Sequence, residues 1–253
     1  MCNDIGIIIQ ARTGSSRLPN KMILPFYENT CILDILLNRL KLFIPDIPII
    51  VATTNAENDG AIVEISKQNR VLCYRGSEND VLQRFIESAD YFGIDKIIRI
   101  CADNPFLDMK ALRELIQQFS VVNCDYLAFS TSLGLPTIKT HYGFWTEAVK
   151  LAALKKIVSL TQESLFHEHV TNYIYTFPDL FKIHYIPIPL EIETKSNIRL
   201  TIDTIEDFNI QKDIFSVLMD KNKFFSTDEV ISVLDAHPDY YEIMQKQINI
   251  NSK

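Results

Sequence analysis

The sequence predicts an α/β protein built on a doubly wound, mostly parallel sheet. In the first half of the chain, apolar runs rich in β-branched residues alternate with segments of helical periodicity, which is the pattern of consecutive βα units. Each apolar run ends in a loop of small or charged residues, as strands do at the ligand-binding edge of an open sheet. We expect one domain over residues 1–253, with a core at about 1–130 and 195–240 and an excursion at about 131–194.

The elements of the first half follow from hydrophobic periodicity. Continuous apolar runs predict buried strands, and apolar residues three or four positions apart predict helices with one buried face. A short extended segment is expected at 22–26, after the first loop. The expected strands are 5–9, 47–53, 70–75, 96–102 and 126–129, and the expected helices are 32–43, 56–68, 81–92 and 109–119.

Capping signals mark where several helices begin. A hydroxyl or carboxylate side chain directly before a helix can accept hydrogen bonds from its first backbone N–H groups. The expected caps are Ser77 with Asp80, Asp108, Thr204 with Asp207, and Ser226 before a helix that ends at 234.

The alternation of strands and helices breaks down between 130 and 189. We therefore expect this region to leave the core. The polar tail from 246 is expected to fray. The expected elements are helices at 145–157 and 162–176, a strand at 181–188, and a core strand at 198–202 that delivers Asp203 to the sheet edge.

Composition limits the classes of function. The net charge of -7 argues against a nucleic-acid polymer as the main partner, because polymer binding usually requires a basic face. Five cysteines occur without a C-x-x-C pair, so we expect reduced thiols in the cytoplasm and neither a zinc knuckle nor a disulfide framework. Asp4 stands where a signal peptide would carry cations, and the apolar run after it is too short to span a bilayer. No membrane association is expected.

The loop after the first strand concentrates positive charge. Arg12, Arg17 and Lys21 surround the stretch Gly14-Ser15-Ser16, whose backbone N–H groups can point at an anion. This solvated loop favours a nucleoside triphosphate. It is not a Walker A loop, because Lys21 lacks a preceding Gly and a following Ser or Thr, and no G-x-G-x-x-G fingerprint occurs. The alternative is that the three cations are ordinary surface charges.

Two aspartates form a candidate metal site. Asp103 and Asp203 each follow an expected strand, so both should reach the sheet edge where the cationic loop lies. Mg²⁺ typically takes one or two carboxylates together with phosphate oxygens, although each aspartate could instead cap a helix. A zinc site at His167-Glu168-His169 is not expected, because histidines two positions apart on a helix point in different directions.

Several ordered motifs carry a family resemblance. They are Gln10-Ala11-Arg12, Ser16-Arg17-Leu18-Pro19 with Lys21, Arg75-Gly76-Ser77 with Asp80-Val81-Leu82, Arg99-Ile100, Asp103-Asn104-Pro105, Glu168-His169-Val170-Thr171, Leu200-Thr201-Ile202-Asp203-Thr204 and Glu206-Asp207. Together they resemble the cytidylyltransferases, specifically the SpsF-like branch of spore coat polysaccharide biosynthesis, which is related to the CMP-sialate and CMP-Kdo synthetases. The resemblance covers most of the chain.

The resemblance implies a nucleotide-diphospho-sugar transferase fold of the GT-A, Rossmann-like type, and a cytoplasmic homodimer. In similar proteins, a segment like that at 131–194 binds the acceptor and forms the homodimer interface. It further implies CTP as donor, Mg²⁺ as cofactor and a small anionic acceptor. Its catalytic residues would be Arg12, Lys21, Asp103 and Asp203, of which the two aspartates would bind the metal. The nucleotide-binding residues would be Gln10, Ala11, Arg12, Gly14, Ser16, Arg17, Lys21, Arg75, Gly76 and Asp103, and the acceptor-binding residues would be Asn104, Lys139, Thr140, Tyr142 and His169.

One stretch departs from the family pattern. Similar proteins carry Pro-x-Gly followed by an Asp and a Glu, and alignment on Pro136 and Phe144 puts Ile138, Thr140 and Tyr142 at those three positions. Loss of two acidic groups predicts an acceptor with more negative charge. The alternative is lost function or a shifted alignment.

Two other functions stay open. A glycosyltransferase of the same architecture would use a nucleotide sugar, but no D-x-D metal motif occurs in the chain. A degenerate homologue could bind nucleotide without catalysis, although the chain keeps both aspartates and the loop lysine.

Overall fold

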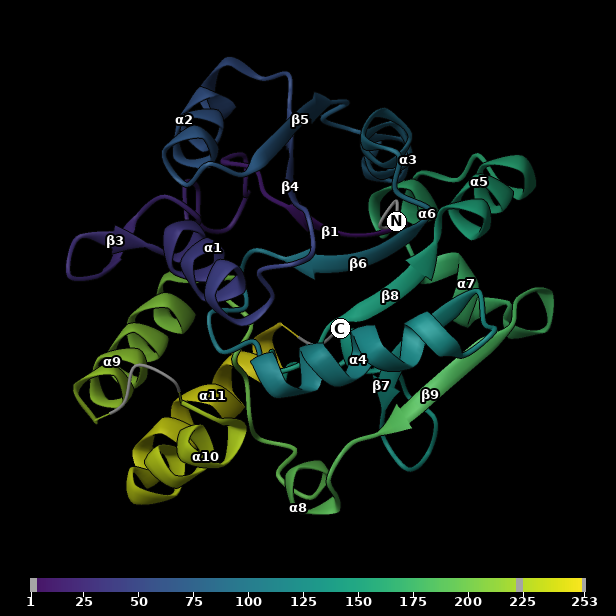
Figure 1. Ribbon diagram of the computed structural model, residues 1–253. Helices are drawn as coiled ribbons and strands as arrows, with labels where there is room; N and C mark the ends of the chain where they lie inside the picture. Colours follow the sequence, from purple (N-terminus) through teal and green to yellow (C-terminus); the bar gives the residue numbers. More distant parts are fainter. Residues whose placement is uncertain (1–3, 222–224, 252–253) are drawn as a thin grey trace.

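The computed structural model describes residues 4–221 and 225–251. Across these residues the chain forms a seven-stranded sheet in the order β5-β4-β1-β6-β8-β7-β9 (Figure 1). The predicted doubly wound, mostly parallel sheet is confirmed, because β8 alone among these strands runs antiparallel to its neighbours β6 and β7. The strands of this sheet are β1 (Ile5–Gln10), β4 (Ile49–Thr54), β5 (Leu72–Gly76), β6 (Lys96–Cys101), β7 (Tyr126–Ser130), β8 (Glu147–Lys150) and β9 (Ile183–Pro187).

Helices cover both faces of the sheet, and a small hairpin follows the first loop. The hairpin consists of β2 (Pro25–Tyr27) and β3 (Thr30–Cys31). The helices are α1 (Ile32–Phe43), α2 (Gly60–Gln68), α3 (Val81–Phe92), α4 (Met109–Val121), α5 (Leu151–Leu160), α6 (Ser164–Glu168), α7 (Asn172–Thr176), α8 (Leu190–Glu193), α9 (Ile205–Lys221), α10 (Thr227–Ala236) and α11 (Pro238–Ile250). Short 3₁₀ turns occupy Glu57–Asp59, Thr137–Lys139 and Pro178–Leu180.

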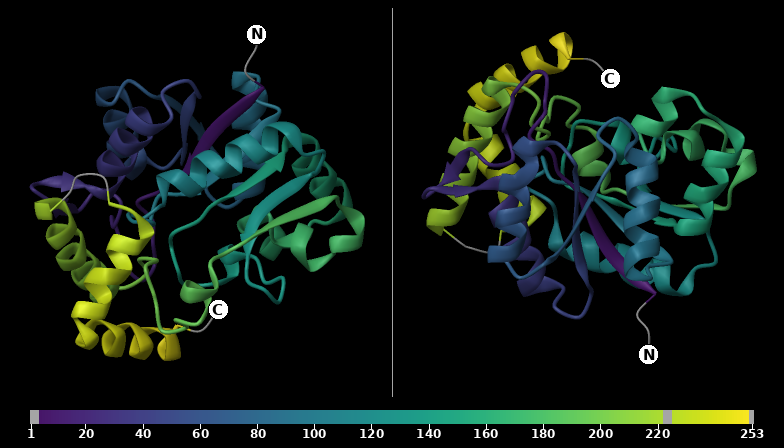
Figure 2. Two further views of the ribbon diagram at one scale, coloured as in Figure 1. Left: turned by 60° about the horizontal axis from the view of Figure 1, so that its bottom comes forward. Right: turned by 90° about the horizontal axis from the view of Figure 1, so that it is seen from above.

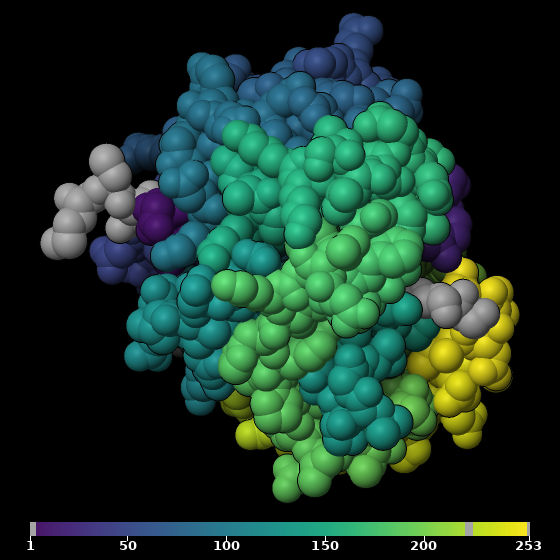
Figure 3. All heavy atoms as spheres, turned by 90° about the vertical axis from the view of Figure 1, so that its right-hand side faces the viewer, coloured from purple at the N-terminus to yellow at the C-terminus, as the bar shows by residue number. Residues whose placement is uncertain are grey.

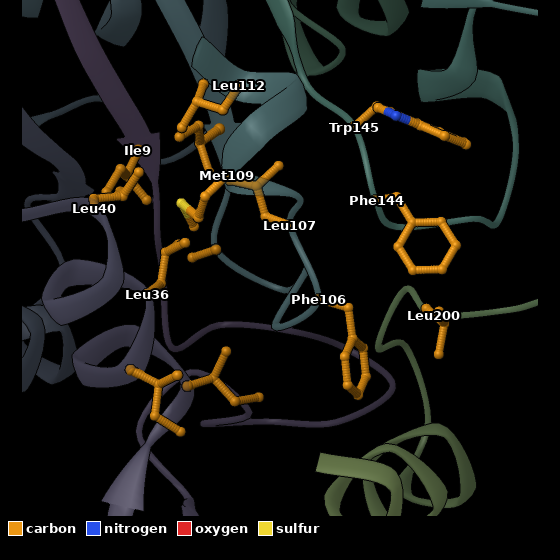
Figure 4. Packing of buried hydrophobic residues seen from close by; sticks show 14 of the residues in the cluster. Ile9, Leu36, Leu40, Phe106, Leu107, Met109, Leu112, Phe144, Trp145 and Leu200 are labelled. Carbon is orange, nitrogen blue, oxygen red and sulfur yellow. The ribbon is translucent and has the colours of Figure 1, made fainter. Parts of the chain in front are cut away.

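The central strand β1 is buried on both faces, as its continuous apolar run predicts. Ile7 and Ile9 face one hydrophobic cluster, which includes α1 and α4, while Ile8 faces a second cluster, which includes α3 and α5. Figure 4 shows the first cluster, where Leu36 and Leu40 of α1 lie against Ile9. Alternate side chains of one strand therefore support both layers of helices.

The last three helices gather at one end of the molecule, beside the β2–β3 hairpin (Figure 2). Phe26 of the hairpin packs edge-on against Phe208 and Phe215 of α9, with ring centroids 5.3 and 5.4 Å apart. Such aromatic contacts add specific geometry to apolar burial. The C-terminal part of the chain thereby closes over the segment that follows the first loop.

On the side shown in Figure 3, residues from about 150 to 190 form a continuous surface next to the C-terminal helices. This surface belongs to the expected excursion at 131–194, yet that region also supplies β8 and β9 to the main sheet. Within the described residues, no helix is both long enough and apolar enough to span a lipid bilayer.

The helix predicted at 145–157 is partly wrong. Strand β8 occupies its first part, and only after it does α5 begin at Leu151. In β8, Ala148 packs into one hydrophobic cluster and Val149 into the other. A strand that is buried on both faces shows no polar alternation, so its sequence could not be told from the start of the helix.

Two other predicted elements also differ from the structure. The helix at 162–176 is interrupted between α6 and α7, where the Thr171 hydroxyl donates to Glu147 over 2.7 Å. The segment 198–202 is mostly buried but is not a strand. Its Leu200 and Ile202 backbone N–H groups donate to two different loops, at the carbonyls of His141 and Asp103, so no ladder can form.

Most predicted helix starts are confirmed. The side chains of Asp108 and Ser226 cap α4 and α10, and the Thr204–Asp207 pair caps α9 reciprocally. The capping box expected at Ser77 is wrong, but the expectation that Asp80 caps α3 is confirmed, because its side chain accepts a hydrogen bond from the backbone N–H of Gln83.

The tail from 246 was expected to fray, but helix α11 continues to Ile250. Met244 is buried in this helix, and its sulfur accepts a hydrogen bond from the backbone N–H of Arg199. Burial of one side chain therefore anchors a helix whose polar composition suggested a frayed end.

Gly143 lies in the connection before β8, and replacing it with alanine tests how tightly this connection packs against Leu200. Its φ is +71°, and an added Cβ would lie 2.4 Å from the Leu200 carbonyl oxygen. We expect Gly143→Ala to lower the free energy of unfolding by about 3 kcal/mol or more, because both the backbone angle and a backbone contact oppose the methyl group.

Gly134→Ala is the matched control for Gly143→Ala. Gly134 has a similar φ of +77°, but nothing lies within 4 Å of an added Cβ. Only the backbone penalty of about 1 kcal/mol applies there. Urea unfolding of both variants measures the difference, and equal destabilisation would show that the Leu200 contact is not tight.

Candidate active site

A cavity of about 660 Å³ opens at the carboxyl ends of β1 and β6. This is the edge at which parallel α/β sheets commonly bind ligands. Both strands deliver polar side chains there, Gln10 from β1 and Asp103 from just beyond β6. The predicted site residues that line the cavity are Gln10, Arg12, Ser16, Arg17, Lys21, Asp103, Asn104, Lys139, Thr140, His169 and Asp203.

Five predicted site residues do not line this cavity. Ala11 is buried, and Gly14 lies on the exposed side of the loop. The Arg75 guanidinium donates to two carbonyls, those of Thr54 and Ala56, and the neighbouring Gly76 is buried.

Tyr142 is the clearest correction among these five residues. Its ring is buried edge-on against Trp145, 5.7 Å away between centroids, and its hydroxyl donates to the Glu193 carbonyl. Its placement in the acceptor wall is therefore wrong, because the phenol faces the protein and not the cavity.

A buried carboxylate fixes the start of the cationic loop. Asp59 is 1% exposed and accepts hydrogen bonds from the backbone N–H and the hydroxyl of Thr13, both over 2.7 Å, and also binds Thr54. Burial opposes ionisation, but the bonds from Thr54 and Thr13 nevertheless lower the pKa of Asp59. The sequence did not indicate this role, because Asp59 stands in a polar segment without a motif.

The Lys21 ammonium lies between the two predicted metal ligands. Its Nζ is 2.8 Å from Asp103 Oδ2 and 3.8 Å from Asp203 Oδ1, and it also donates to the Ile202 carbonyl. Lys21 is only 8% exposed, so the expectation of a solvated loop is wrong for this residue. It holds for Arg17, which is exposed.

The two aspartates fit a divalent metal. Carboxylates from separate segments converge on one cation, which shows that this point favours positive charge. Among residues 4–221 and 225–251 no group of three or more His, Cys, Asp or Glu side chains could hold a metal ion. Two carboxylates with substrate phosphates match the preference of Mg²⁺, whereas an all-protein site would need more ligands.

Asp203 is held from behind by Arg199, which the sequence analysis did not identify. Arg199 is fully buried; it donates to Asp203 over 2.8 Å and, through Nε and Nη2, to Asp207 over 2.8 and 2.9 Å. Burial opposes the charge of Asp207, but the bonds from Arg199 lower its pKa. The spacing of Arg199, Asp203 and Asp207, four residues apart, is the signal that could have indicated this cluster.

A second buried cluster lies beneath the cavity, and it too was missed. Arg99 of β6 donates to Glu147 of β8 over 2.5 Å, and the two residues are direct cross-strand partners. Tyr126 and Thr171 also donate to the Glu147 carboxylate. Because β8 was expected to be helical, no sequence pattern indicated that these residues pair.

The outer wall of the cavity carries mixed charge. The Lys139 ammonium lies 5.7 Å from the centre of the Tyr175 ring, and Arg12 approaches Glu168 to 3.9 Å. Asn104 is 8% exposed, and its side-chain oxygen has no hydrogen-bond partner within the part of the chain that the structure describes. A buried acceptor of this kind gains most from a ligand that donates to it.

His167, of the His167-Glu168-His169 motif, lies behind this wall. Both of its ring nitrogens have hydrogen-bond partners within the protein, so its position is explained without a bound zinc ion. The ring nitrogens of His167 bond to Asp80 over 2.7 Å and to the Thr161 carbonyl over 3.2 Å. Burial opposes protonation, but these two bonds raise the pKa of His167 above its usual 6.5. The pair joins α6 to the start of α3.

We expect this pair to make stability depend on pH. A raised pKa means that the stabilisation is fully present below about pH 6.5 and is lost as the pH rises through the pKa of the folded protein. His167→Gln should lower the free energy of unfolding by about 1 kcal/mol at pH 6 and by less at pH 9. Urea unfolding of both proteins at the two pH values measures this, and a pH-independent difference would contradict it.

Sequence comparison agrees with this geometry. The family model described as Cytidylyltransferase matches residues 6–243. The uncharacterized protein MJ1063 of Methanocaldococcus jannaschii is 38% identical over 246 residues, which cover 96% of this chain and 93% of that protein. The spore coat polysaccharide biosynthesis protein SpsF of Bacillus subtilis is 33% identical over 242 residues, which cover 94% of this chain and 96% of SpsF.

Solved structures agree as well. A cytidylyltransferase from Leptospira borgpetersenii superposes with a TM-score of 0.83 at 33% identity, covering 94% of this chain and 97% of that one. A CMP:2-keto-3-deoxy-manno-octonic acid synthetase complexed with CTP has the same fold, with a TM-score of 0.61 at 12% identity over 84% of this chain and 98% of that one. The resemblance inferred from the motifs is confirmed, and the chain belongs to the cytidylyltransferase family of nucleotidyltransferases.

Proposed function

We propose that the protein is a Mg²⁺-dependent cytidylyltransferase that transfers CMP from CTP to an acidic sugar or a phosphorylated acceptor and releases pyrophosphate. The observation that carries this proposal is the convergence of Lys21, Asp103 and Asp203 at one cavity whose rim bears Arg12 and Arg17. The synthetase of the same fold was solved with bound CTP, which supports CTP as the donor. The name of SpsF refers to polysaccharide biosynthesis, which supports a product used for polysaccharide synthesis.

The loop residues would position the triphosphate. Arg12 and Arg17 line the cavity, and the Asp59 anchor keeps the loop backbone in place. Transfer of a nucleotidyl group leaves a protein mainly the tasks of orientation and charge stabilisation. An acceptor oxygen would attack the α-phosphorus of CTP, and the bond to the pyrophosphate oxygen would break.

Asp103 and Asp203 would hold Mg²⁺, which when bound neutralises phosphate charge as a Lewis acid. Lys21 would remain beside the phosphates as a fixed positive charge, since its ammonium already lies in the same pocket. Arg17 and Arg199 would orient Asp203, because Arg17 forms an ion pair with its carboxylate over 2.9 Å and Arg199 donates to it over 2.8 Å.

The acceptor would lie against the wall formed by Asn104, Lys139, Thr140 and His169, all of which line the cavity. Lys139 supplies a positive charge there, and Asn104 offers its unpartnered oxygen to an acceptor hydroxyl. We also propose a cytoplasmic homodimer, on the strength of the family resemblance, and the molecular mass in solution tests the dimer.

Asp103→Asn and Asp203→Asn test the metal site. The amide keeps the shape of the side chain but loses the charge that binds a hard cation, so we expect turnover to fall about 10²- to 10³-fold and the Mg²⁺ requirement to rise. Mg²⁺ titration with CTP present is the measurement. Unchanged Mg²⁺ dependence in both variants would refute the two-aspartate site.

Lys139→Glu tests the acceptor wall. Reversing this charge should raise the KM for an anionic acceptor about tenfold and leave the KM for CTP unchanged. Lys156→Glu is the matched control, because Lys156 also lies over an aromatic ring, 4.8 Å from the centre of Phe181, but does not line the cavity. An unchanged acceptor KM in Lys139→Glu would place the acceptor elsewhere.

The proposed activity is tested by combining each nucleoside triphosphate with a panel of acidic sugars and phosphorylated alcohols. Pyrophosphate release is measured with Mg²⁺ present and absent. We expect release with CTP, Mg²⁺ and at least one anionic acceptor. Binding of CTP without turnover would favour the degenerate homologue, and release of a nucleoside diphosphate from a nucleotide sugar would favour a glycosyltransferase.

A further inference from the structure

Arg84, in the first turn of α3, is a fully buried cation that the mechanism above does not use. Its exposure is 0%, and one nitrogen, Nη1, donates to the Ser77 carbonyl. The other two nitrogens, Nε and Nη2, have no hydrogen-bond partner within residues 4–221 and 225–251. A guanidinium has five donors, so most of its capacity is unused.

No carboxylate of the described residues forms an ion pair with Arg84. Three carboxylates, those of Asp59, Asp80 and Glu78, attract Arg84 electrostatically without forming a direct ion pair with it. Asp59 binds Thr13 and Thr54 instead, and Asp80 binds the Gln83 backbone and His167. Arg84 therefore differs from Arg99 and Arg199, which both have a carboxylate partner.

Three effects make a cation costly at this point. Burial removes the guanidinium from water, and Arg12 nearby carries the same charge; burial first and then Arg12 lower the pKa of Arg84 to about 10. The position in the first turn of α3 adds the positive end of the helix dipole. A well-packed apolar residue in place of a buried charged group is often neutral or stabilising, and natural proteins break such local rules mainly at functional sites.

Arg84 lies directly behind the cationic loop. An added Cβ on Gly76 would be 3.0 Å from Arg84 Cγ, so the arginine stem packs beneath the end of β5. The turn that accepts its hydrogen bond continues to Glu78, whose carboxylate oxygen would lie 3.5 Å from a Cβ on Gly14. The guanidinium is thus placed under a turn that touches the loop bearing Arg12.

We propose that Arg84 is a positioning residue whose positive charge, not directly paired with any carboxylate of the described residues, lies behind the loop and favours binding of a polyphosphate. It does not touch the ligand. Its field acts through the buried, low-dielectric region around Gly76 and Ser77, where charges are screened less than at the surface. The proposal rests on the proposed function only in that the loop binds the triphosphate of the donor.

Three variants separate charge from shape. Arg84→Met removes the charge and fills the space, Arg84→Gln removes the charge but can still donate to Ser77, and Arg84→Lys keeps the charge. Calorimetric binding of inorganic tripolyphosphate and of CTP, each without metal, gives the affinities, and thermal unfolding gives the midpoint. Arg39→Met is the matched control, because Arg39 is buried with a pKa lowered to about 10 but binds Pro105 and Leu107 carbonyls and not the loop.

We expect Arg84→Met and Arg84→Gln to weaken tripolyphosphate binding about tenfold while the unfolding midpoint stays equal or rises. Arg84→Lys should keep the affinity within about threefold of the unmodified protein, and Arg39→Met should not change it. If Arg84→Met does not fold, the comparison of Arg84→Gln with Arg84→Lys tests by itself whether the charge of Arg84 favours binding.

An unchanged affinity in Arg84→Gln would overturn the proposal. An equal loss in Arg84→Gln and Arg84→Lys would also overturn it, because the affinity would then depend on the shape of the guanidinium and not on its charge. The two proposals fail separately. Tripolyphosphate binding that depends on Arg84 without any CTP binding would refute the cytidylyltransferase and leave the role of Arg84 standing.

Discussion

The Lys21 ammonium joins three segments that no common strand or helix connects. It binds Asp103 after β6, the Ile202 carbonyl and Asp203, while it is itself carried by the loop after β1. Without a cation between them, the two carboxylates would repel each other. Because 198–202 is not a strand, the place of Asp203 depends on these side-chain contacts and on Arg199 behind it. The site therefore holds its shape through charge pairing and not through backbone regularity.

Buried arginines around the cavity fall into two kinds. Arg99 and Arg199 each meet a buried carboxylate, and removing one partner of such a pair leaves an uncompensated charge, which is strongly destabilising. These pairs tie strands and loops together. Among the residues that the structure describes, no carboxylate forms an ion pair with Arg84, so its buried charge is hard to explain by stability and fits the presence of an anionic ligand near the loop.

The two sides of the cavity, which we propose bind nucleotide and acceptor, share one framework. The cross-strand pair of Arg99 and Glu147 links β6 to β8, and Thr171 ties the break between α6 and α7 to the same carboxylate. Arg99 also reaches Gln10 of β1, over 3.3 Å. Side chains that would contact donor and acceptor are thus positioned by adjacent strands, which suits a reaction in which the protein mainly orients two substrates.

The sequence by itself determined the βα order, the cationic loop and the two aspartates. Continuous apolar runs such as 5–9 and cap residues such as Asp108 act locally, so their effect can be read from neighbouring positions. The family motifs added the expected chemistry. The resemblance to cytidylyltransferases depends on residue identities in order, and these are fully present in the sequence.

Only the tertiary structure decided which charges meet. Strand β8 is too short and too evenly buried to be told from a helix, so the pairing of Arg99 with Glu147 was hidden. The burial of Lys21, the placement of Tyr142 away from the cavity and the isolation of Arg84 depend on residues distant in the chain. Burial and charge pairing are properties of the folded arrangement, because the cost of a charge is set by its surroundings and not by its neighbours in sequence.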